Sequence, residues 1–292
     1  MTFRENRVGT SRINAPRAEW RALVLLGVVL ALAGCGGGFR PRDYANPEEL
    51  FRASLAQYQA KHWDNAQIGF EQLSNELSAR DPLLPPVLFY LAMTHEMRKD
   101  NLLASQAFMR VADGFPDDTL APDAVLGSGR NLQAMWRKTV LDPTEGQQAA
   151  TTFRQLLAAY PNSKAAAAAK TRIDTLSDRF ATKDYDTGVH YLRRGAIDPA
   201  IIYFRDVVTL YPDTPHARLA WLRLHELYTK IRWKDDAADV CLELWKVYPD
   251  TDTEVLAACG KEPAATPADS VKVKKDTVAI LPGALARPGP GR

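Results

Sequence analysis

Residues 149–163 read AATTFRQLLAAYPNS, and the fold can be predicted from the pattern they contain. A small residue, Ala149, is followed four positions later by Phe153 and then by the pair Tyr160-Pro161. Residues four apart lie on one face of a helix, so Ala149 lets a neighbouring helix approach while Phe153 fills the gap beside it. Proline disfavours helical geometry in the residue before it, so we expect the helix to end at Tyr160.

The same pattern recurs along the chain, which is typical of a repeat protein. The complete copies are Ala104, Phe108 and Phe115-Pro116; Ala149, Phe153 and Tyr160-Pro161; Ala200, Phe204 and Tyr211-Pro212; and Ala237, Cys241 and Tyr248-Pro249. A further copy, Ala66 and Phe70, lacks the aromatic-proline pair. It comes first in the chain, where the terminal repeat of an array is expected to be atypical.

Each of these helices follows a stretch with its own helical periodicity, so the repeat is expected to be two helices joined by a short turn. The sequence predicts five such pairs, near residues 47–79, 85–115, 121–160, 163–211 and 215–249. The predicted fold class is therefore all-α, a tetratricopeptide-repeat superhelix of about five helix pairs. No break occurs between residues 163 and 194, so a single helix of about 48 Å is expected there. A last short helix is expected at residues 252–259.

The first 34 residues have the features of a secretory signal, because five arginines precede an apolar run at residues 22–33. This run is well short of the roughly 20 residues that a membrane-spanning helix requires. It ends in four residues that resemble the lipobox of bacterial lipoproteins, namely Leu32, Ala33, Gly34 and Cys35. The resemblance implies a covalent lipid on the Cys35 thiol, and Gly36 after it favours export to the outer membrane.

Four segments follow from these observations. They are a signal peptide at 1–34, a lipidated flexible tether at 35–46, helical repeats at 47–260 and a disordered tail at 261–292. Three acyl chains on a bacterial lipoprotein should hold it permanently, because two already suffice for stable anchoring. We therefore expect localisation at the cell outer membrane, lipid-anchored, on the periplasmic face.

Charge and cysteine content limit the classes of partner and of stabilisation. Removal of residues 1–34 takes away five basic and two acidic side chains, so the net charge falls from +2 to −1. No bulk basic character remains, and a nucleic-acid partner is not expected. The other cysteines, Cys241 and Cys259, can form a disulfide if the last two helices fold back on each other, or can remain buried free thiols. The sequence leaves both readings open.

No constellation of catalytic or metal-ligating residues is evident. The histidines are scattered among different predicted helices, and His95 and His225 lack the second histidine at i+4 that a helix-borne zinc site requires. Residues 127–129 read Gly-Ser-Gly without the following Lys-Ser/Thr of a phosphate loop, so close packing of helices explains them better. We expect a protein that is not an enzyme, with no metal and no cofactor besides the lipid on Cys35. Most tryptophans are expected in the core, and an exposed one would suit an interface.

The motifs, in the order in which they occur, resemble those of a known family. The resemblance lies in FRQLLAAYPNS at 153–163, in HYLRRG at 190–195 and in the segment that ends in YPDT at 211–214. Together with the lipobox and the five repeats, these segments resemble the BamD family, lipoproteins of the outer-membrane β-barrel assembly machinery. The resemblance implies a periplasmic scaffold that docks on the POTRA domains of the barrel-forming subunit BamA. It also implies that the protein helps to receive unfolded outer-membrane protein clients, and it leaves room for small accessory lipoproteins.

Candidate partner-binding residues follow from the resemblance and from position. Tyr58 and Tyr90 of the early helices can line an inner groove for a client, or can equally be core aromatics. In the family, the fourth and fifth repeats can present a basic residue to the barrel subunit, but the aligned position here is Tyr203. The basic residues near it are Arg205, Arg193 and Arg194. A competing interpretation is a repeat lipoprotein that regulates peptidoglycan enzymes or the Tol-Pal system.

Overall fold

The computed structural model describes residues 39–248 and 252–261. The predicted signal peptide, the lipobox with Cys35, Pro249 and all of the predicted tail except Lys261 lie outside the described residues. Within the part that is described, no helix is long and apolar enough to cross a membrane.

The described residues form a 3-10 helix and eleven α-helices, with no strand among them, so the all-α prediction is confirmed. The elements are η1 Pro41–Asp43, α2 Pro47–Gln59, α3 Trp63–Glu76, α4 Leu84–Arg98, α5 Asn101–Gly114, α6 Ala121–Met135, α7 Thr144–Ala159, α8 Lys164–Arg193, α9 Ile197–Leu210, α10 Pro215–Lys230, α11 Lys234–Val247 and α12 Thr253–Cys259. The pairs α2/α3, α4/α5, α6/α7, α8/α9 and α10/α11 are the five repeats.

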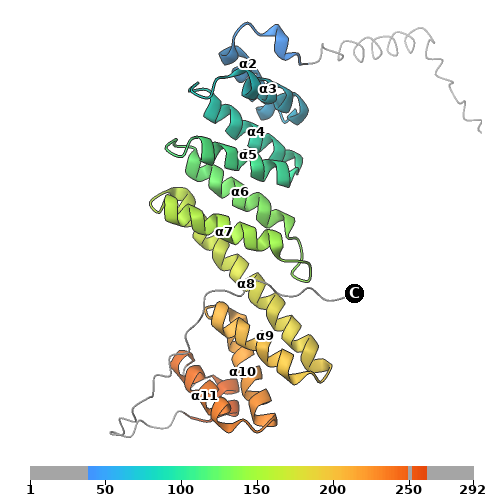
Figure 1. The fold of residues 1–292 in the computed structure, drawn as a ribbon, viewed down its shortest axis with the longest axis vertical. Coiled ribbons are helices and arrows are strands. Elements are labelled where there is room, and N and C mark those ends of the chain that lie inside the picture. The colour runs from blue at the N-terminus through green and yellow to red at the C-terminus, as the bar shows by residue number, and fades with distance from the viewer. Residues whose placement is uncertain (1–38, 249–251, 262–292) are drawn as a thin grey trace, which may run out of the picture.

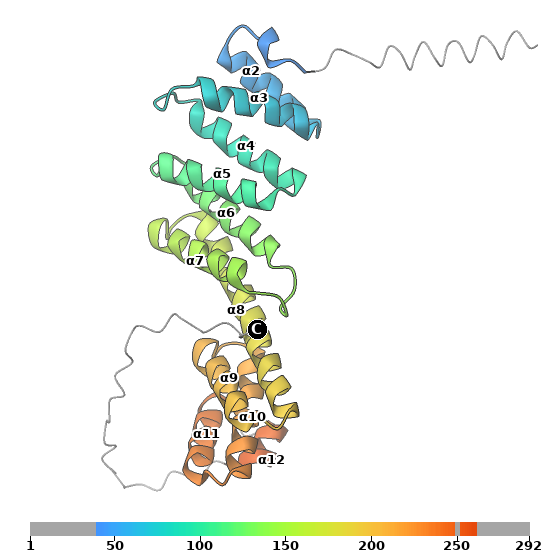
Figure 2. The same ribbon diagram turned by 45° about the vertical axis from the view of Figure 1, so that its right-hand side comes forward.

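Successive helices stack into an elongated array, in which each packs mainly on the helices before and after it in sequence (Figure 1). Helices run back and forth across the array, so the turns within repeats gather on one edge and the turns between repeats on the other (Figures 1 and 2). This arrangement is the superhelix of a tetratricopeptide-repeat protein, as predicted.

The aromatic-proline pairs end the second helix of four repeats. The C-cap residues of α5, α7, α9 and α11 are Phe115, Tyr160, Tyr211 and Tyr248, and each donates its backbone N–H to the carbonyl four residues earlier. The following proline has no N–H to continue the helix. The next helix then starts on a new cap, as at Ser163, whose hydroxyl accepts a hydrogen bond from the Ala166 N–H at 3.1 Å.

The repeated small and aromatic residues form the interior of the array. The alanines Ala66, Ala104, Ala149, Ala200 and Ala237 and the aromatic residues Phe70, Phe108, Phe153 and Phe204 are all buried. The glycines of the Gly-Ser-Gly motif allow this packing, because a Cβ atom added at Gly129 would lie 2.4 Å from the Phe153 ring. A Cβ atom at Gly127 would lie 2.8 Å from the Phe108 ring. Close helix packing therefore explains the motif, as expected.

The long helix α8 joins the two halves of the array (Figure 1). It has 30 residues, as the absence of a break predicted. Its Leu176 and Phe180 belong to the core cluster of α4 to α7, whereas Ala181 begins the cluster of α9 to α12. Tyr211 packs against both clusters. One helix is thus part of the hydrophobic cores of both halves.

Candidate partner-binding surfaces and the C-terminal clamp

A disulfide joins Cys241 of α11 to Cys259 of α12, with the two Cα atoms 5.5 Å apart. The alternative that these two cysteines are free thiols is therefore wrong. The bond spans 18 residues and holds the last helix against the end of the array.

Arg218 of α10 holds the same helix by charge. Its Nε and Nη2 atoms donate to the two carboxylate oxygens of Asp252 at 2.6 and 2.5 Å, and Nη1 donates to Glu254 at 2.7 Å. Asp252 also caps α12 by accepting hydrogen bonds from the Glu254 and Val255 N–H groups. The hydrogen bond from Arg218 and these backbone bonds lower the pKa of Asp252 from 3.8 to about 2.

The contacts of Arg218 with Asp252 and Glu254 form a C-terminal clamp that holds α12. The lowered pKa of Asp252 predicts that this clamp weakens in acid. A carboxylate whose folded-state pKa lies below its unfolded-state value stabilises the fold above the unfolded-state pKa and loses this contribution as the pH falls. Stability from Asp252 should therefore be constant above about pH 5 and decrease between about pH 4 and pH 2. Urea unfolding at pH 7, 4 and 2 measures how the free energy of unfolding depends on pH.

The matched control is Asp252→Asn, which keeps an N-cap acceptor but carries no charge. The pH-dependent loss between pH 4 and pH 2 should be smaller in this variant than in the wild type. An identical loss in both would show that other carboxylates account for the acid sensitivity.

The predicted groove residues Tyr58 and Tyr90 lie in an aromatic cluster at the start of the array. Their ring centroids are 5.7 Å apart, and Tyr58 also meets Trp63 at 5.1 Å. Tyr90 stacks on the buried Phe70 at 5.9 Å. Both tyrosines are only partly buried, so they pack against the N-terminal core and retain exposed surface.

A pair of charges next to this cluster was not foreseen. Arg130 of α6 donates two hydrogen bonds, at 2.6 and 2.5 Å, to the carboxylate of Glu96 in α4. Burial first, and then the Glu96 carboxylate, raise the pKa of Tyr58, which places the phenol near this pair. The two partners are 34 residues apart on different helices, so no local sequence signal could have joined them.

The turn between α6 and α7 is longer than the other turns within repeats and is fastened to α8. Trp136 is buried, and the Arg179 guanidinium lies over its ring at 4.2 Å and donates to its backbone carbonyl. The Lys183 ammonium donates to the carbonyls of Thr139 and Leu141 at 3.2 and 2.9 Å. Val140 is left 75% exposed at the tip, so the turn presents apolar surface on a rigid support.

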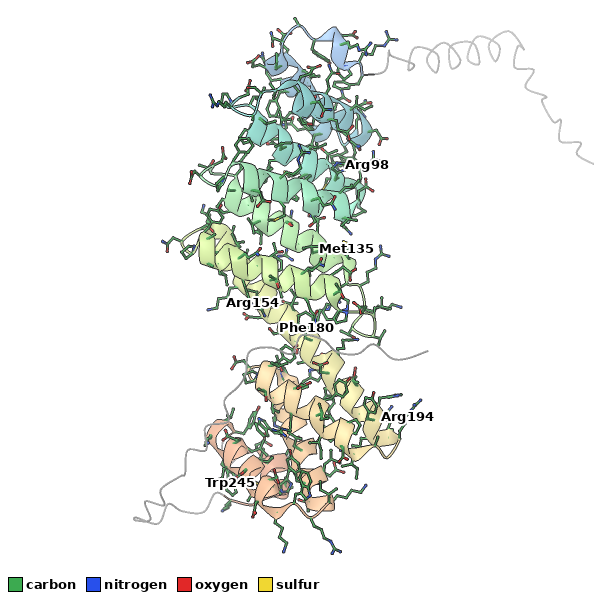
Figure 3. The ribbon with its side chains drawn as sticks, viewed as in Figure 1. Arg98, Met135, Arg154, Phe180, Arg194 and Trp245 are labelled. Atoms are coloured by element: carbon green, nitrogen blue, oxygen red, sulfur yellow. A yellow bond between two sulfur atoms is a disulfide. The ribbon has the colours of Figure 1, made fainter. Side chains whose placement is uncertain are left out.

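The basic residues assigned to docking lie in two places. Arg193 and Arg194 are exposed at the C-terminal end of α8, and Figure 3 shows Arg194 on the same edge of the array as Arg98. Arg205 of α9 is exposed and lines a groove of about 350 Å³ between α9, α10 and α11, together with Asp236 and Asp239. The structure therefore does not bring Arg205 together with Arg193 and Arg194 in one groove.

The tryptophans divide between the core and the surface. Trp136 is fully buried, whereas Trp63, Trp221 and Trp245 are partly buried. Trp233 is 51% exposed in the turn before α11 and stacks on Tyr228. It is the type of residue that anchors protein interfaces.

The histidines are distributed over several helices, but His225 of α10 has partners that the sequence did not reveal. One of its ring nitrogens and the sulfur atoms of Cys241 and Cys259 all lie within 4.8 Å of one another. The spacing of residues within α10 could not reveal this cluster, because the two sulfur atoms come from two other helices.

Comparison with known proteins gives the context for these surfaces. A family model described as an outer membrane lipoprotein, YfiO, matches residues 43–242. The outer membrane protein assembly factor BamD of Rickettsia prowazekii is 24% identical over 241 residues, which cover 79% of this chain and 91% of that protein. The BamD of Caulobacter vibrioides is 32% identical over 96 residues, and this match spans only about a third of either protein, 33% of this chain and 32% of the relative.

Solved structures with similar folds are tetratricopeptide-repeat proteins. One from Bacteroides fragilis is 14% identical, with 74% of this chain and 97% of that chain covered and a TM-score of 0.45. Another, from Thermus thermophilus, is 19% identical, with 73% and 96% covered and a TM-score of 0.33. These likenesses concern the fold alone.

Proposed function

Because the chain belongs to the YfiO family of outer membrane lipoproteins, we propose that it is a lipid-anchored, periplasm-facing scaffold of the complex that assembles β-barrel outer-membrane proteins. Cys35 would carry the anchor. The protein would act by binding, without a catalytic step, and would dock on the barrel-forming subunit while it helps to receive unfolded clients.

One observation carries this proposal. The similarity to the assembly factor from Rickettsia prowazekii extends over 91% of that protein and 79% of this chain, so it is not confined to one repeat. Tetratricopeptide repeats are common in unrelated proteins, and two shared repeats would have little weight. A match along nearly the whole relative favours a shared role.

The end of α8 suits docking on the barrel subunit. Arg193 and Arg194 are both exposed at the C-terminal end of this helix. Arginine binds carboxylates in a bidentate geometry that fixes orientation as well as charge. These two guanidinium groups are therefore available to acidic side chains of a POTRA domain, and Arg205 offers a second contact on α9.

The aromatic cluster at the other end suits an extended client. Tyr58 and Tyr90 retain partly exposed rings whose positions are fixed by Phe70 and Trp63 behind them. Such rings contribute contact area at a low cost in conformational entropy. The adjacent Glu96 and Arg130 offer hydrogen-bond partners for a peptide backbone.

The test is a pull-down of the lipidated protein from its own outer membrane in mild detergent, followed by mass spectrometry. We expect a POTRA-containing barrel protein in near-equal amount. The double variant Arg193→Glu, Arg194→Glu should reduce its recovery at least about tenfold, because reversed charges meet like charges across the interface.

Arg154→Glu is the matched control, since Arg154 is an exposed arginine of α7 away from the proposed contact (Figure 3). It should leave recovery unchanged. Recovery of peptidoglycan enzymes or Tol-Pal components without the barrel protein would overturn the assembly role and favour the regulator. Equal recovery of the barrel protein with the wild type, the double variant and Arg154→Glu would mean that the docking surface lies elsewhere.

A further inference from the structure

Three side chains from three different helices converge at the end of the array. They are His225 of α10, Cys241 of α11 and Cys259 of α12, whose ligand-type atoms lie within 4.8 Å of one another. In the disulfide form the two sulfur atoms are bonded to each other and are not free to bind a cation. In the dithiol form, which every newly made chain has before oxidation, both are available.

We propose that the dithiol form of this protein binds one Zn²⁺ ion through the thiolates of Cys241 and Cys259 and a ring nitrogen of His225. This inference is independent of the proposed function. Two sulfurs and one imidazole nitrogen form a ligand set that zinc prefers, and sites with three protein ligands keep a fourth position for water.

The geometry needs only a small adjustment. Zinc lies about 2.3 Å from sulfur and about 2.0 Å from nitrogen in a tetrahedral arrangement, so the ligand atoms must be about 3.5 to 3.8 Å apart. The His225 ring nitrogen already lies within 4.8 Å of both sulfur atoms, whereas the two sulfur atoms must move apart once their bond is reduced. The two cysteine Cα atoms, 5.5 Å apart, allow the sulfur atoms to separate by side-chain rotation alone.

Contacts other than the disulfide keep these ligands together after reduction. Arg218 holds Asp252 and Glu254 by hydrogen bonds of 2.5 to 2.7 Å. Val255 is buried against the core. The Trp245 indole N–H also donates to the carbonyl of Gly260 at 3.2 Å. Cys259 therefore stays close to Cys241 when the sulfur–sulfur bond is absent.

One of the three ligands, His225, borders space that is open to solvent. His225 lines a groove of about 590 Å³ between α8, α10 and α12, together with Glu254 and Ala258. Binding converts Zn²⁺ and two thiols into a zinc dithiolate and two released protons, with no change of oxidation state. Zinc and the disulfide are thus alternative states of the same sulfur pair, and bound zinc should slow disulfide formation.

The experiment uses the full chain, purified from membranes in detergent and reduced with a phosphine under nitrogen. After the phosphine is removed, Zn²⁺ is titrated against a chromophoric chelator, and the thiols are then counted with and without an oxidant. We expect one tightly bound Zn²⁺ per reduced chain, none per oxidised chain, and thiols that oxidise more slowly when zinc is bound.

His225→Ala should weaken binding to the reduced chain at least about tenfold, because loss of a supporting group near a metal already costs 10- to 100-fold. His216 lies outside the cluster, so the control variant His216→Ala should leave zinc binding to the reduced chain unchanged. His225→Ala retains the disulfide, so its folding can be verified in the oxidised state. The proposal is overturned if the reduced chain binds no zinc, if the oxidised chain binds as tightly, or if both histidine variants behave alike.

Discussion

Replacement of Phe153 by alanine is expected to lower the free energy of unfolding by about 3 to 5 kcal/mol, the cost of deleting a fully buried aromatic side chain. Phe153 has no exposed surface and belongs to the core cluster of α4 to α7. Its ring fills the space that Gly129 of α6 leaves open. The helices cannot close this gap completely, so the variant loses both transfer free energy and packing contacts. Urea unfolding followed by circular dichroism measures the change.

Two control variants test whether the loss of stability comes from the loss of buried volume. Leu103→Ala removes a side chain that is 51% exposed and should change stability by less than about 1 kcal/mol. Phe153→Leu fills part of the ring's volume and should fall between the wild type and Phe153→Ala. A loss below about 1 kcal/mol for Phe153→Ala would contradict the role given to the small-aromatic pairs, because the array would then not depend on them.

The repeats could be predicted because their signals are local. Ala149, Phe153 and Tyr160-Pro161 lie within one helix and its end, and a spacing of four residues fixes which side chains share a face. The same holds for α8, where the absence of any proline over 30 residues is itself the signal. A helix-ending motif needs no knowledge of the neighbouring helices, so it can be identified in a single sequence.

The candidate sites could be predicted only in part, because they depend on distant residues. Arg130 meets Glu96 across 34 positions, and the turn from Trp136 is fastened by Lys183 of another repeat. The convergence of His225 with two cysteines depends on how α10, α11 and α12 cross. Such crossings arise from the packing of whole helices, for which the spacing of residues in one helix holds no information.

Proline in the middle of α8 is expected to cost about 3 kcal/mol or more and to weaken the coupling between the halves of the array. Asp174 is exposed and lies well inside this helix, so Asp174→Pro removes one helical hydrogen bond and forces a clash with the carbonyl four residues earlier without disturbing a buried side chain. This helix contributes buried residues to both core clusters and so links them. Stability in a repeat array is a sum of repeats and their interfaces, so a weakened junction should broaden or split the urea transition.

Lys164→Pro is the matched control within the same helix. Lys164 is the first helical residue, where an N–H has no helical partner, and Ser163 before it has the extended conformation, ψ 153°, that a following proline favours. This variant should change stability by less than about 0.5 kcal/mol, because proline is well tolerated at that position. Equal effects of the two prolines would mean that α8 does not act as a continuous support. A large, split transition for Asp174→Pro alone would show that α8 couples the two halves of the array into one cooperative unit.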